Sequence, residues 1–376
     1  MASHRREIDP ERVTEFVASD PVVRKVLEAA GDVRLYLVGG SVRDLLVGRS
    51  PSELDFVAEG PVSGIASALD PEARVHQEFG TAEVSIEGAP VDLAEARSET
   101  YPAPGALPVV ESADLDSDLA RRDFSINAIA VSVGPGGGLF DPFGGMQDLE
   151  NGVLRILHED SFIDDPTRAF RAARYCSRLD LSPDSETLSQ LERTDLSTVS
   201  SDRIDRELEL IARELDPAAA LILLSSWGLL DVQPDALSFS AAAFRTVRGE
   251  PWSAICTERE VIRGLLSPSV LDAARALVAP PGSDWDCYRA ARSADPVTLV
   301  LAQAAGSAWV QRWPADWIDV QLHISGDDLI EAGLPEGPAV GAGLEAAMKD
   351  RLLNGDGGRE RELSIALQGN GGSGPG

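Results

Sequence analysis

Lysine is almost missing from this 376-residue sequence, in which only Lys25 and Lys349 accompany 31 arginines. Cysteine is also scarce. The three cysteines are an odd number at wide spacing, Cys176, Cys256 and Cys287, so the sequence predicts neither a disulfide framework nor a zinc knuckle. Unpaired cysteines of this kind are typical of a protein in the reducing cytoplasm.

Long apolar runs are absent as well. No segment approaches the roughly 18 uninterrupted apolar residues that a membrane-spanning helix requires. The first residues, MASHRREIDPER, have no apolar stretch behind them, so the sequence does not predict a secretory signal. Histidine occurs only four times and forms no HD-type motif, which argues against a histidine metal cluster. We expect a cytoplasmic protein with no membrane partner and no evident obligate protein partner.

Positive charge is in short supply, because 62 acidic residues oppose 33 basic ones and leave a formal net charge of −29. A nucleic-acid-binding protein is normally basic, since neutralising phosphates supplies much of the affinity. On charge alone the sequence argues against a nucleic-acid partner. Residues 51–119 hold 15 acidic residues and only two arginines, so the arginines gather elsewhere. A high-salt habitat, which would screen the repulsion, is one hypothesis for this composition.

A chain of this length predicts two or three domains. Residues 10–30 have apolar residues at helical spacing, which predicts a single helix in the N-terminal segment 1–30. Residues 31–152 alternate short strands with helices, which predicts an α/β head with a small mixed sheet. The pattern beyond the head is helical, with prolines between the segments. We therefore predict an all-α neck at 153–235 and an all-α body and tail at 236–368. The low-complexity residues 369–376 are expected to be disordered.

The first candidate site residues follow an apolar run that ends in Gly39 and Gly40. Glycine lets backbone N–H groups approach a phosphate, and a helix that begins at the same point favours an anion. Further on, Glu53 and Asp55 share one face of a predicted strand, because residues i and i+2 of a strand point to the same side. Two carboxylates beside a phosphate cradle favour a divalent-metal site, although the glycine pair alone could be a simple turn. Asp92, in an otherwise apolar strand, is either a third ligand or an exposed residue.

The second group of candidates is the segment RRDFSINAIA. Its first two residues, Arg121 and Arg122, could hold phosphates by bidentate contacts. Asp123 and Asn127, one helical turn apart, could hydrogen-bond a ribose. A surface cluster of salt bridges is the alternative interpretation.

The third group is a set of arginines that recur at helical spacing, namely Arg168, Arg171, Arg174 and Arg178. Asp165, close to Arg168, places one acceptor beside a fork of donors, which is enough to read the Watson–Crick edge of a base. A solvated helix face with ion pairs is the alternative. In the segment that follows, Arg203 and Glu207 stand at i and i+4, and we expect them only to brace the preceding helix.

Together these segments resemble the class II tRNA nucleotidyltransferase and bacterial poly(A) polymerase family. The resemblance runs from about Leu35 to Leu215 and rests on six motifs in the family's order. The motifs are LVGGSVRDLL with ELDF, VDLAEAR, DLARRDFSINAIA, LFDPFGGMQDL, FIDDPTRAFRAARY and RIDREL. Two positions depart from the pattern, since the family usually has Asp at Glu53 and more commonly Glu at Asp164. The residues beyond Leu215 carry no family motif.

The resemblance implies a polymerase-β-like head with a helical neck, body and tail, Mg²⁺ as the cofactor, and tRNA, ATP and CTP as partners. Glu53, Asp55 and Asp92 would be the catalytic, metal-binding carboxylates. The residues placed at the nucleotide are Gly39, Gly40, Ser41, Arg43, Arg122, Asp123, Asn127, Asp165, Arg168, Arg171 and Arg174. The family's flexible loop, which reorients the base-selecting pair, corresponds to residues 98–119. Arg171, Arg174 and Arg178 are our candidates for RNA contact in this acidic chain, and RNA binding by the body and tail is inferred from position.

We therefore predict a template-independent RNA nucleotidyltransferase that adds CMP, AMP or both to the 3′ end of tRNA. The 3′ hydroxyl would attack the α-phosphate of the nucleotide with the help of a metal ion. A poly(A) polymerase and a CC-adding enzyme are alternatives, although the length of the loop at 98–119 argues against CC addition alone. The motif DDPTR and the residues VAEG after Asp55 look more like those of A-adding members. The choice between CCA addition and terminal-A addition stays open. A catalytically weak RNA-binding protein and an enzyme acting on a small molecule are alternatives from other classes.

Overall fold

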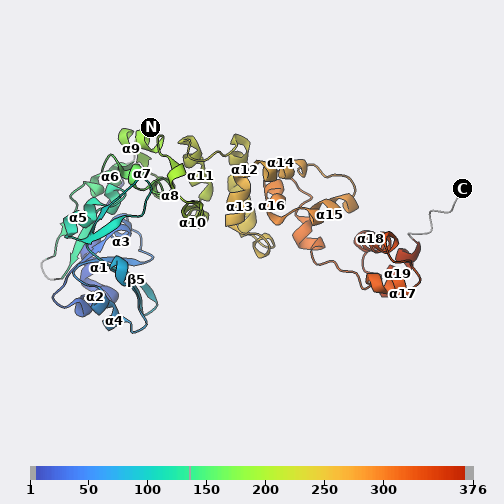
Figure 1. The fold of residues 1–376 in the computed structure, drawn as a ribbon, viewed down its shortest axis with the longest axis horizontal. Coiled ribbons are helices and arrows are strands. Elements are labelled where there is room, and N and C mark those ends of the chain that lie inside the picture. The colour runs from blue at the N-terminus through green and yellow to red at the C-terminus, as the bar shows by residue number, and fades with distance from the viewer. Residues whose placement is uncertain (1–5, 135–136, 369–376) are drawn as a thin grey trace. The chain divides into compact units, whose positions relative to one another are not determined.

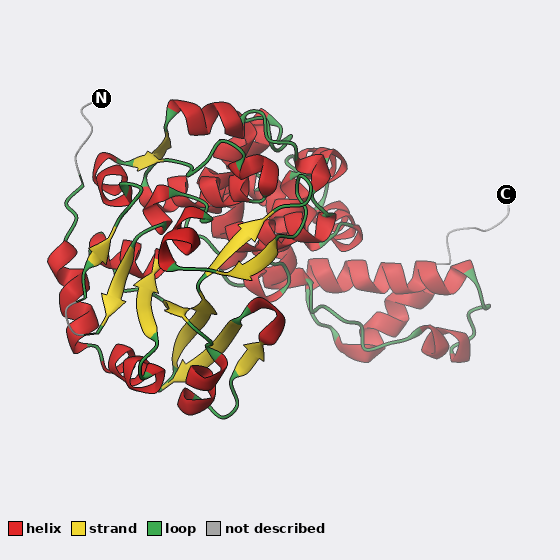
Figure 2. Ribbon diagram, turned by 60° about the vertical axis from the view of Figure 1, so that its left-hand side comes forward, coloured by secondary structure: helices red, strands yellow, loops and turns green. Residues whose placement is uncertain are grey.

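The computed structural model describes residues 6–134 and 137–368, and the chain forms two compact units, Met1–Leu230 and Asp231–Gly376. The described strands all lie in the first unit, and the second unit is built from helices (Figures 1 and 2). This confirms the predicted α/β head followed by helices. The finer division into head, neck, body and tail stays a prediction, and residues 369–376 lie outside the described residues. Over the described part of the chain, no helix has both the length and the apolar composition needed to cross a membrane.

A seven-stranded mixed sheet is the centre of the first unit, in the order β3-β4-β5-β2-β1-β8-β9. Its strands are β1 (Arg34–Val38), β2 (Leu54–Glu59), β3 (Arg74–His76), β4 (Thr81–Ile86), β5 (Ala89–Glu95), β8 (Ala130–Val133) and β9 (Leu139–Phe140). β2 and β5 pair in parallel, and the other neighbouring strands are antiparallel. The central strands β1 and β2 are buried along most of their length, whereas β4 alternates buried with exposed residues because it lies near the sheet edge.

Six helices pack around this sheet. They are α1 (Pro10–Ser19), α2 (Pro21–Ala30), α3 (Gly39–Leu46), α4 (Ser63–Leu69), α5 (Leu115–Ala120) and α6 (Gly145–Asn151). The single helix predicted over residues 10–30 is therefore two helices. The reason is local: the Asp20 side chain caps α2 by accepting hydrogen bonds from the N–H groups of Val22 and Val23, and Pro21 has no N–H with which to continue α1.

The segment 98–119, predicted as a mobile loop, contains regular structure. β6 (Arg97–Thr100) and β7 (Val109–Ser112) form an antiparallel hairpin, and α5 follows directly. The tip of the hairpin is anchored, because Gly105 packs so closely on Thr198 that an added Cβ would lie 2.7 Å from the Thr198 hydroxyl oxygen. Its backbone φ of +68° also favours glycine.

The remainder of the first unit is almost entirely helical. It comprises α7 (Ser161–Asp164), α8 (Arg168–Leu179), α9 (Ser185–Leu191), α10 (Ser201–Ala212) and α11 (Pro217–Ser226). One feature was not predicted: the two-residue strands β10 (Val153–Leu154) and β11 (Ser182–Pro183) pair in parallel. A pair this short carries no alternation that a sequence pattern could reveal.

The second unit contains α12 (Pro234–Arg248), α13 (Glu258–Leu265), α14 (Pro268–Ala276), α15 (Asp284–Ser293), α16 (Pro296–Ala304), α17 (Gly326–Glu331), α18 (Pro338–Asn354) and α19 (Gly358–Gln368). Four of these helices begin with proline, which suits the first turn because its missing N–H would have no partner there. Aromatic side chains, among them Trp285, Tyr288 and Trp317, form one of its cores with Met348. Four of the prolines in this part of the sequence thus mark helix starts, whereas others, such as Pro251, do not.

Candidate active site

A cavity of about 460 Å³ in the first unit brings most of the predicted site residues together. The predicted residues that line it are Gly39, Gly40, Arg43, Glu53, Asp55, Arg122, Asp123, Asn127, Asp165, Arg168, Arg171, Arg174 and Arg178. Arg121, which the sequence suggested as a phosphate contact, also lines the cavity, and Glu99, Tyr101 and Tyr175 complete the lining. Residues from α3, β2, β6 and α8 therefore meet at one site.

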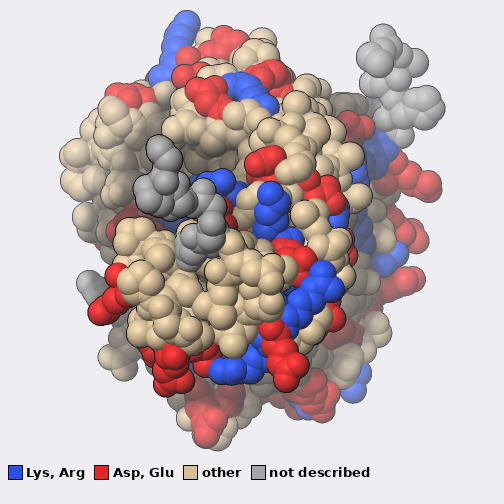
Figure 3. Space-filling model, turned by 90° about the vertical axis from the view of Figure 1, so that its right-hand side faces the viewer, with Lys and Arg blue, Asp and Glu red and all other residues tan. Residues whose placement is uncertain are grey.

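The cavity differs in charge from the chain as a whole. Seven arginines and five carboxylates line it, although the chain carries a formal net charge of −29. On the face of the molecule drawn in Figure 3, by contrast, Arg and Lys side chains lie scattered among Asp and Glu. Guanidinium groups bind phosphates in a forked, bidentate geometry, so this lining favours a ligand with several phosphates.

Of the glycine pair at the start of α3, Gly39 is required by close packing and is more than a turn. Gly39 has a φ of +61°, and a Cβ added there would lie 2.8 Å from Nη1 of Arg122. A Cβ at Gly40 would lie 3.5 Å from Oδ2 of Asp55. The absence of a side chain at Gly39 thus lets Arg122 approach the N-terminus of the helix, whereas the distance at Gly40 is ordinary van der Waals contact.

Ser41, predicted to contact the nucleotide, does not line the cavity. It is almost completely buried, accepts a hydrogen bond of 2.8 Å from the Asp55 N–H, and lies 3.1 Å from the Glu53 carbonyl oxygen, to which its hydroxyl donates. Contact between Ser41 and a nucleotide stays a prediction. The hydroxyl holds the first residues of β2 in place, a contact that connects positions far apart in the sequence.

The acidic residues gather where β2 meets β5. Glu53 directly precedes β2, and Asp55 lies opposite Asp92 in the parallel pairing of β2 with β5, two strands whose backbones lie about 4.8 Å apart. Burial, together with the negative charges of Glu53 and Asp92, raises the pKa of Asp55 to about 6. Asp92 lines an adjoining cavity with Glu53 and does not line the main one. The arrangement concentrates negative charge on oxygen atoms, which is what a hard divalent cation requires.

The three carboxylates are not drawn together as tightly as in a bound metal site. Among the described residues, the one group of three possible ligands whose atoms all lie within 4.8 Å of one another is His323, Asp356 and Glu362, in the second unit. In that group Arg351 donates hydrogen bonds to His323 and to Glu362, so the space for a cation already holds a guanidinium. The carboxylates of Glu53, Asp55 and Asp92, in the first unit, are the better candidates for binding a divalent cation.

Asp123 and Asn127 belong to a buried network. The Asp123 carboxylate accepts hydrogen bonds from Nδ2 of Asn127 at 2.9 Å and from Nε of Arg171 at 2.7 Å, and Asn127 accepts one from Nη1 of Arg43 at 2.6 Å. Burial alone would raise the pKa of Asp123, but Arg171 and Asn127 outweigh it and hold that pKa below its usual range. Four predicted residues thus form one connected set beside the cavity.

Asp165 lines the cavity just beyond the end of α7. Its Oδ1 accepts hydrogen bonds from the N–H and the hydroxyl of Thr167, at 3.0 and 2.6 Å, and from Nη2 of Arg203 at 2.8 Å. Arg203 was expected to brace a helix next to Glu207. The structure instead gives it a direct contact with a predicted base-selecting residue.

Arg168, the other predicted base-selecting residue, is buried at the start of α8. It donates to the hydroxyl of Ser161 at 2.7 Å, to the carbonyl oxygen of Arg121 at 2.9 Å, and to the hydroxyl of Tyr101 at 3.4 Å. Burial, together with neighbouring Glu99, raises the pKa of Tyr101 to about 12, so this hydroxyl stays protonated. Arg168 and Asp165 therefore reach the same cavity but are held by separate partners.

The arginine stripe on α8 is paired with carboxylates. Arg171 bonds Asp123, while Arg174 and Arg178 both donate to the buried Glu214, at 2.8 Å and 2.9 Å. Their contact with RNA stays a prediction. The pairing with Glu214 was not foreseen, because Glu214 follows these arginines by some 40 positions and no helical spacing connects it to α8.

Sequence reasoning missed Glu99 and Tyr101. Both lie in the segment that was interpreted as a loop, and Glu99 accepts hydrogen bonds from Arg121 and from the Tyr101 hydroxyl. Residues 97–100 are Arg-Ser-Glu-Thr, all polar, so they carry no apolar alternation that could have revealed the strand. Their role depends on a hairpin that only tertiary packing places at the cavity.

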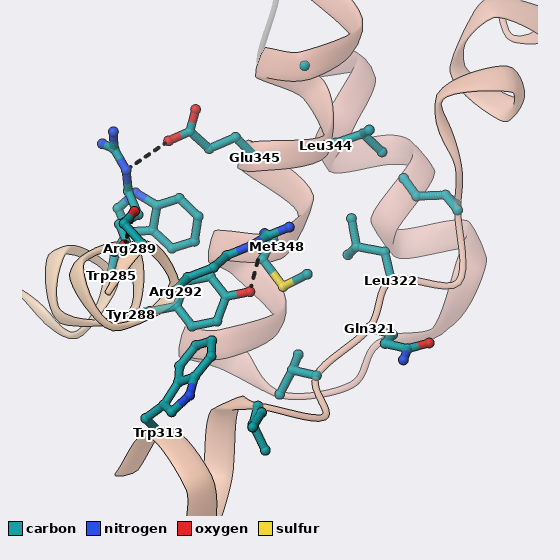
Figure 4. A pocket seen from close by; sticks show the side chains of 15 residues that line it. Trp285, Tyr288, Arg289, Arg292, Trp313, Gln321, Leu322, Leu344, Glu345 and Met348 are labelled. Atoms are coloured by element: carbon teal, nitrogen blue, oxygen red, sulfur yellow. Dashed lines mark hydrogen bonds and ion pairs between the residues drawn. The ribbon is translucent and has the colours of Figure 1, made fainter. Parts of the chain in front are cut away.

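A larger cavity of about 700 Å³ lies in the second unit between α15 and α18 (Figure 4). Aromatic side chains, including Tyr288 and Trp313, line it with Met348. Figure 4 shows Arg289 directed toward Glu345, with which it forms an ion pair of 3.5 Å. None of the predicted site residues lines this cavity, and its lining contains neither a pair of carboxylates nor a glycine turn. The smaller cavity, in the first unit, is therefore the better candidate for the active site.

Comparison with known proteins agrees with the site geometry. The sequence profile described as "Poly A polymerase head domain" matches residues 35–155. The CC-adding tRNA nucleotidyltransferase of Deinococcus radiodurans is 32% identical over 329 residues, which cover 84% of this chain and 84% of that protein. The A-adding tRNA nucleotidyltransferase of Halalkalibacterium halodurans is 42% identical over 214 residues, which cover 53% of this chain and 50% of that protein.

Two further A-adding relatives are longer than their matched part. This chain spans 23% of the protein from Aquifex aeolicus and 45% of that from Geobacter sulfurreducens, so it covers half or less of the A-adding relatives.

Among solved structures, a tRNA-processing enzyme in an apo form has a TM-score of 0.65 at 26% identity, covering 87% of this chain and 97% of that one. A CCA-adding enzyme in an apo form has a TM-score of 0.78 at 24% identity, with 96% of each chain covered, which shows a shared fold.

Proposed function

The chain belongs to the class II tRNA nucleotidyltransferase family, and from this premise we propose that it adds CMP, AMP or both to the 3′ end of tRNA without a template. The observation that carries the proposal is the cavity in which the glycine turn, the carboxylates of β2 and seven arginines meet. In the proposed reaction the 3′ hydroxyl of the RNA attacks the α-phosphate of the nucleotide. A phosphodiester bond forms, and pyrophosphate leaves as the bond between the α- and β-phosphates breaks.

The phosphate side of the cavity is formed by the turn at Gly39 and Gly40 and by neighbouring guanidinium groups. Backbone N–H groups at the start of α3 and the side chains of Arg121 and Arg122 can bind the β- and γ-phosphates. Since nucleotidyl transfer requires mainly positioning and charge stabilisation, fixed donors at the leaving pyrophosphate lower the barrier.

Glu53, Asp55 and Asp92 are the residues that would hold Mg²⁺. They offer only oxygen atoms, and the pKa of Asp55 is raised by burial and by the charges of Glu53 and Asp92, a situation that a divalent cation relieves. The bound ion supplies activation of the attacking hydroxyl and charge stabilisation at the leaving group. Ser41 keeps Asp55 in place for this task through its hydrogen bond to the Asp55 N–H.

The nucleotide base would be selected by the protein itself. Asp165 offers acceptors and Arg168 offers donors at the same cavity, which together can match the Watson–Crick edge of cytosine or adenine. The ribose would lie by Asp123 and Asn127, whose mutual hydrogen bond can be exchanged for bonds to its hydroxyls.

RNA would reach the site along α8, with the second unit as a further contact surface. Arg171, Arg174 and Arg178 remain the candidate RNA contacts. To bind phosphates they would have to exchange part of their present hydrogen bonds with carboxylates.

Three buried free thiols, at Cys176, Cys256 and Cys287, support the proposal of a reducing, cytoplasmic location.

The test is incorporation of radiolabelled CTP and ATP, with magnesium, into three tRNA transcripts that lack CCA, end in C or end in CC. Extension of all three to CCA supports a full CCA-adding enzyme. Addition of A to the CC-ended transcript alone supports an A-adding enzyme, and addition of C alone supports a CC-adding one. Long A-tails on any RNA would favour a poly(A) polymerase, and no incorporation at low or high salt would refute the proposal.

A further inference from the structure

Asp118, in α5, carries a negative charge in a place without solvent. Its side chain is fully buried, at 0% exposure. Burial alone would raise the pKa of Asp118, but the guanidinium groups of Arg122 and Arg121 outweigh it and hold that pKa below its usual range. Burying a carboxylate costs folding free energy unless the group is paired and hydrogen-bonded. The partners of Asp118 must therefore stabilise its charge.

Each carboxylate oxygen of Asp118 holds a different arginine. Oδ1 accepts hydrogen bonds from Nε of Arg121 at 2.9 Å and from its Nη2. Oδ2 accepts from Nε and Nη2 of Arg122, at 3.2 and 2.8 Å. Asp118 itself does not line the cavity, whereas both arginines do. It can therefore influence a ligand only through them.

This pairing determines where the remaining donors point. Nη1 of Arg122 is left to face the glycine turn, where it lies 3.3 Å from the Asn127 carbonyl oxygen and 2.8 Å from the position of a Cβ on Gly39. Two adjacent arginines repel each other, and the shared carboxylate between them removes that repulsion. The anchor also fixes the Arg121 backbone, whose carbonyl oxygen accepts a hydrogen bond from Arg168 at 2.9 Å.

We propose that Asp118 is a positioning residue that fixes Arg121 and Arg122 for the phosphates of the incoming nucleotide, and through the Arg121 carbonyl also supports Arg168. This inference rests on the proposed function, because it takes a nucleoside triphosphate as the ligand of the cavity. The benefit is preorganisation: side chains already held in the binding geometry lose little conformational entropy when the triphosphate arrives.

Asp148 provides a matched control for the test. It is also buried in the first unit and pairs with an arginine, accepting from Nε of Arg155 at 3.1 Å and from the Ser125 hydroxyl at 2.6 Å, but neither it nor Arg155 lines the cavity. The experiment compares Asp118→Asn with Asp148→Asn in the full chain. We expect Asp118→Asn to raise the KM for ATP about tenfold, the scale of one charge-assisted hydrogen bond, and to weaken binding of inorganic triphosphate equally.

A merely structural role would give a different result. Loss of folded protein lowers kcat without changing the KM of the molecules that remain, and the KM for the RNA primer should stay unchanged in both variants. The same KM for ATP in Asp118→Asn and Asp148→Asn would overturn the inference. A wild-type chain that binds neither ATP nor triphosphate would instead overturn the proposed function from which the inference starts.

The replacement of a buried charge can prevent folding, so a second pair of variants is included. Asp118→Glu and Asp148→Glu both keep the charge, and the longer side chain of Asp118→Glu displaces the two arginines of the cavity. A KM for ATP that rises in Asp118→Glu alone supports the inference, and equal values in the two variants overturn it.

Discussion

Arg203 donates a hydrogen bond of 2.8 Å to Asp165, and its other amino group donates one of 2.7 Å to the carbonyl oxygen of Gly105. One side chain on α10 thus joins a candidate base-selecting residue to the tip of the β6–β7 hairpin. A change in the position of that hairpin would be transmitted directly to the Asp165 carboxylate.

Replacement of Arg203 by Gln should therefore disturb nucleotide choice. We expect the ratio of kcat/KM for CTP to kcat/KM for ATP to change about tenfold, because Asp165 would lose a charge-assisted hydrogen bond of roughly 1.4 kcal/mol. Competition between labelled CTP and ATP measures the ratio. Arg206→Gln, at an exposed position of the same helix, is the control. An unchanged ratio in Arg203→Gln would show that the contact does not affect selection.

Gly39 provides a test of the phosphate side. Gly39→Ala should destabilise the first unit by roughly 1–2 kcal/mol, because a Cβ is unfavourable at a φ of +61°, and should raise the KM for ATP by displacing Arg122. Gly31→Ala is the matched control, since Gly31 has a φ of +58° but no atom within 4 Å of an added Cβ. Thermal unfolding should show similar losses in both variants. A KM that rises in both, or in neither, contradicts the close approach of Arg122.

Asp55→Asn should lower nucleotide incorporation by roughly a thousandfold, since several kcal/mol of charge stabilisation by a metal would be lost. The magnesium concentration needed for half-maximal rate should rise as well. Glu83→Gln lies on β4, which β5 separates from β2, and outside the main cavity, and is expected to keep most of its activity. An Asp55→Asn enzyme with the magnesium dependence of the wild type would remove Asp55 from the set of ligands.

Glu214 should contribute both to stability and to restraint of α8. Burial alone would raise the pKa of Glu214, but Arg178 and Arg174 outweigh it and hold that pKa below its usual value of 4.5. A carboxylate with a lowered pKa stabilises the fold above that usual value, and the contribution is lost as the pH falls through the lowered one. Glu214→Gln should therefore cost about 1–2 kcal/mol at pH 7, discounted for the partial exposure of Arg178, and the difference from the wild type should shrink below pH 4.5.

The same variant should change RNA affinity in the opposite direction. Release of Arg174 and Arg178 from Glu214 leaves two cations for phosphates, so binding of a tRNA transcript should tighten and become more sensitive to salt. Filter binding at two salt concentrations measures both effects. Weaker binding by Glu214→Gln would mean that Glu214 orients these arginines for RNA, in which case their pairing is part of the binding surface.

The amino-acid sequence by itself determined the fold class and the residue types of the site. Gly39, Asp55, Asp123 and Arg168 could be predicted because their motifs encode local chemistry, such as a turn without side chains or an arginine at a helix start. Proline likewise predicted helix starts in the second unit, since its ring affects only its own turn.

Tertiary structure decided which partner each of these groups has. Asp118, Arg203 and Glu214 show no function in the sequence, because a hydrogen bond between distant segments leaves no periodic pattern. The hairpin at 97–112 was misjudged, and the buried position of Ser41 was not foreseen, for the same reason: burial and pairing depend on what packs against a segment from elsewhere in the chain. Local sequence determines the helices and strands and supplies the reactive groups. Long-range packing determines which charged groups form pairs and how deeply each of them is buried.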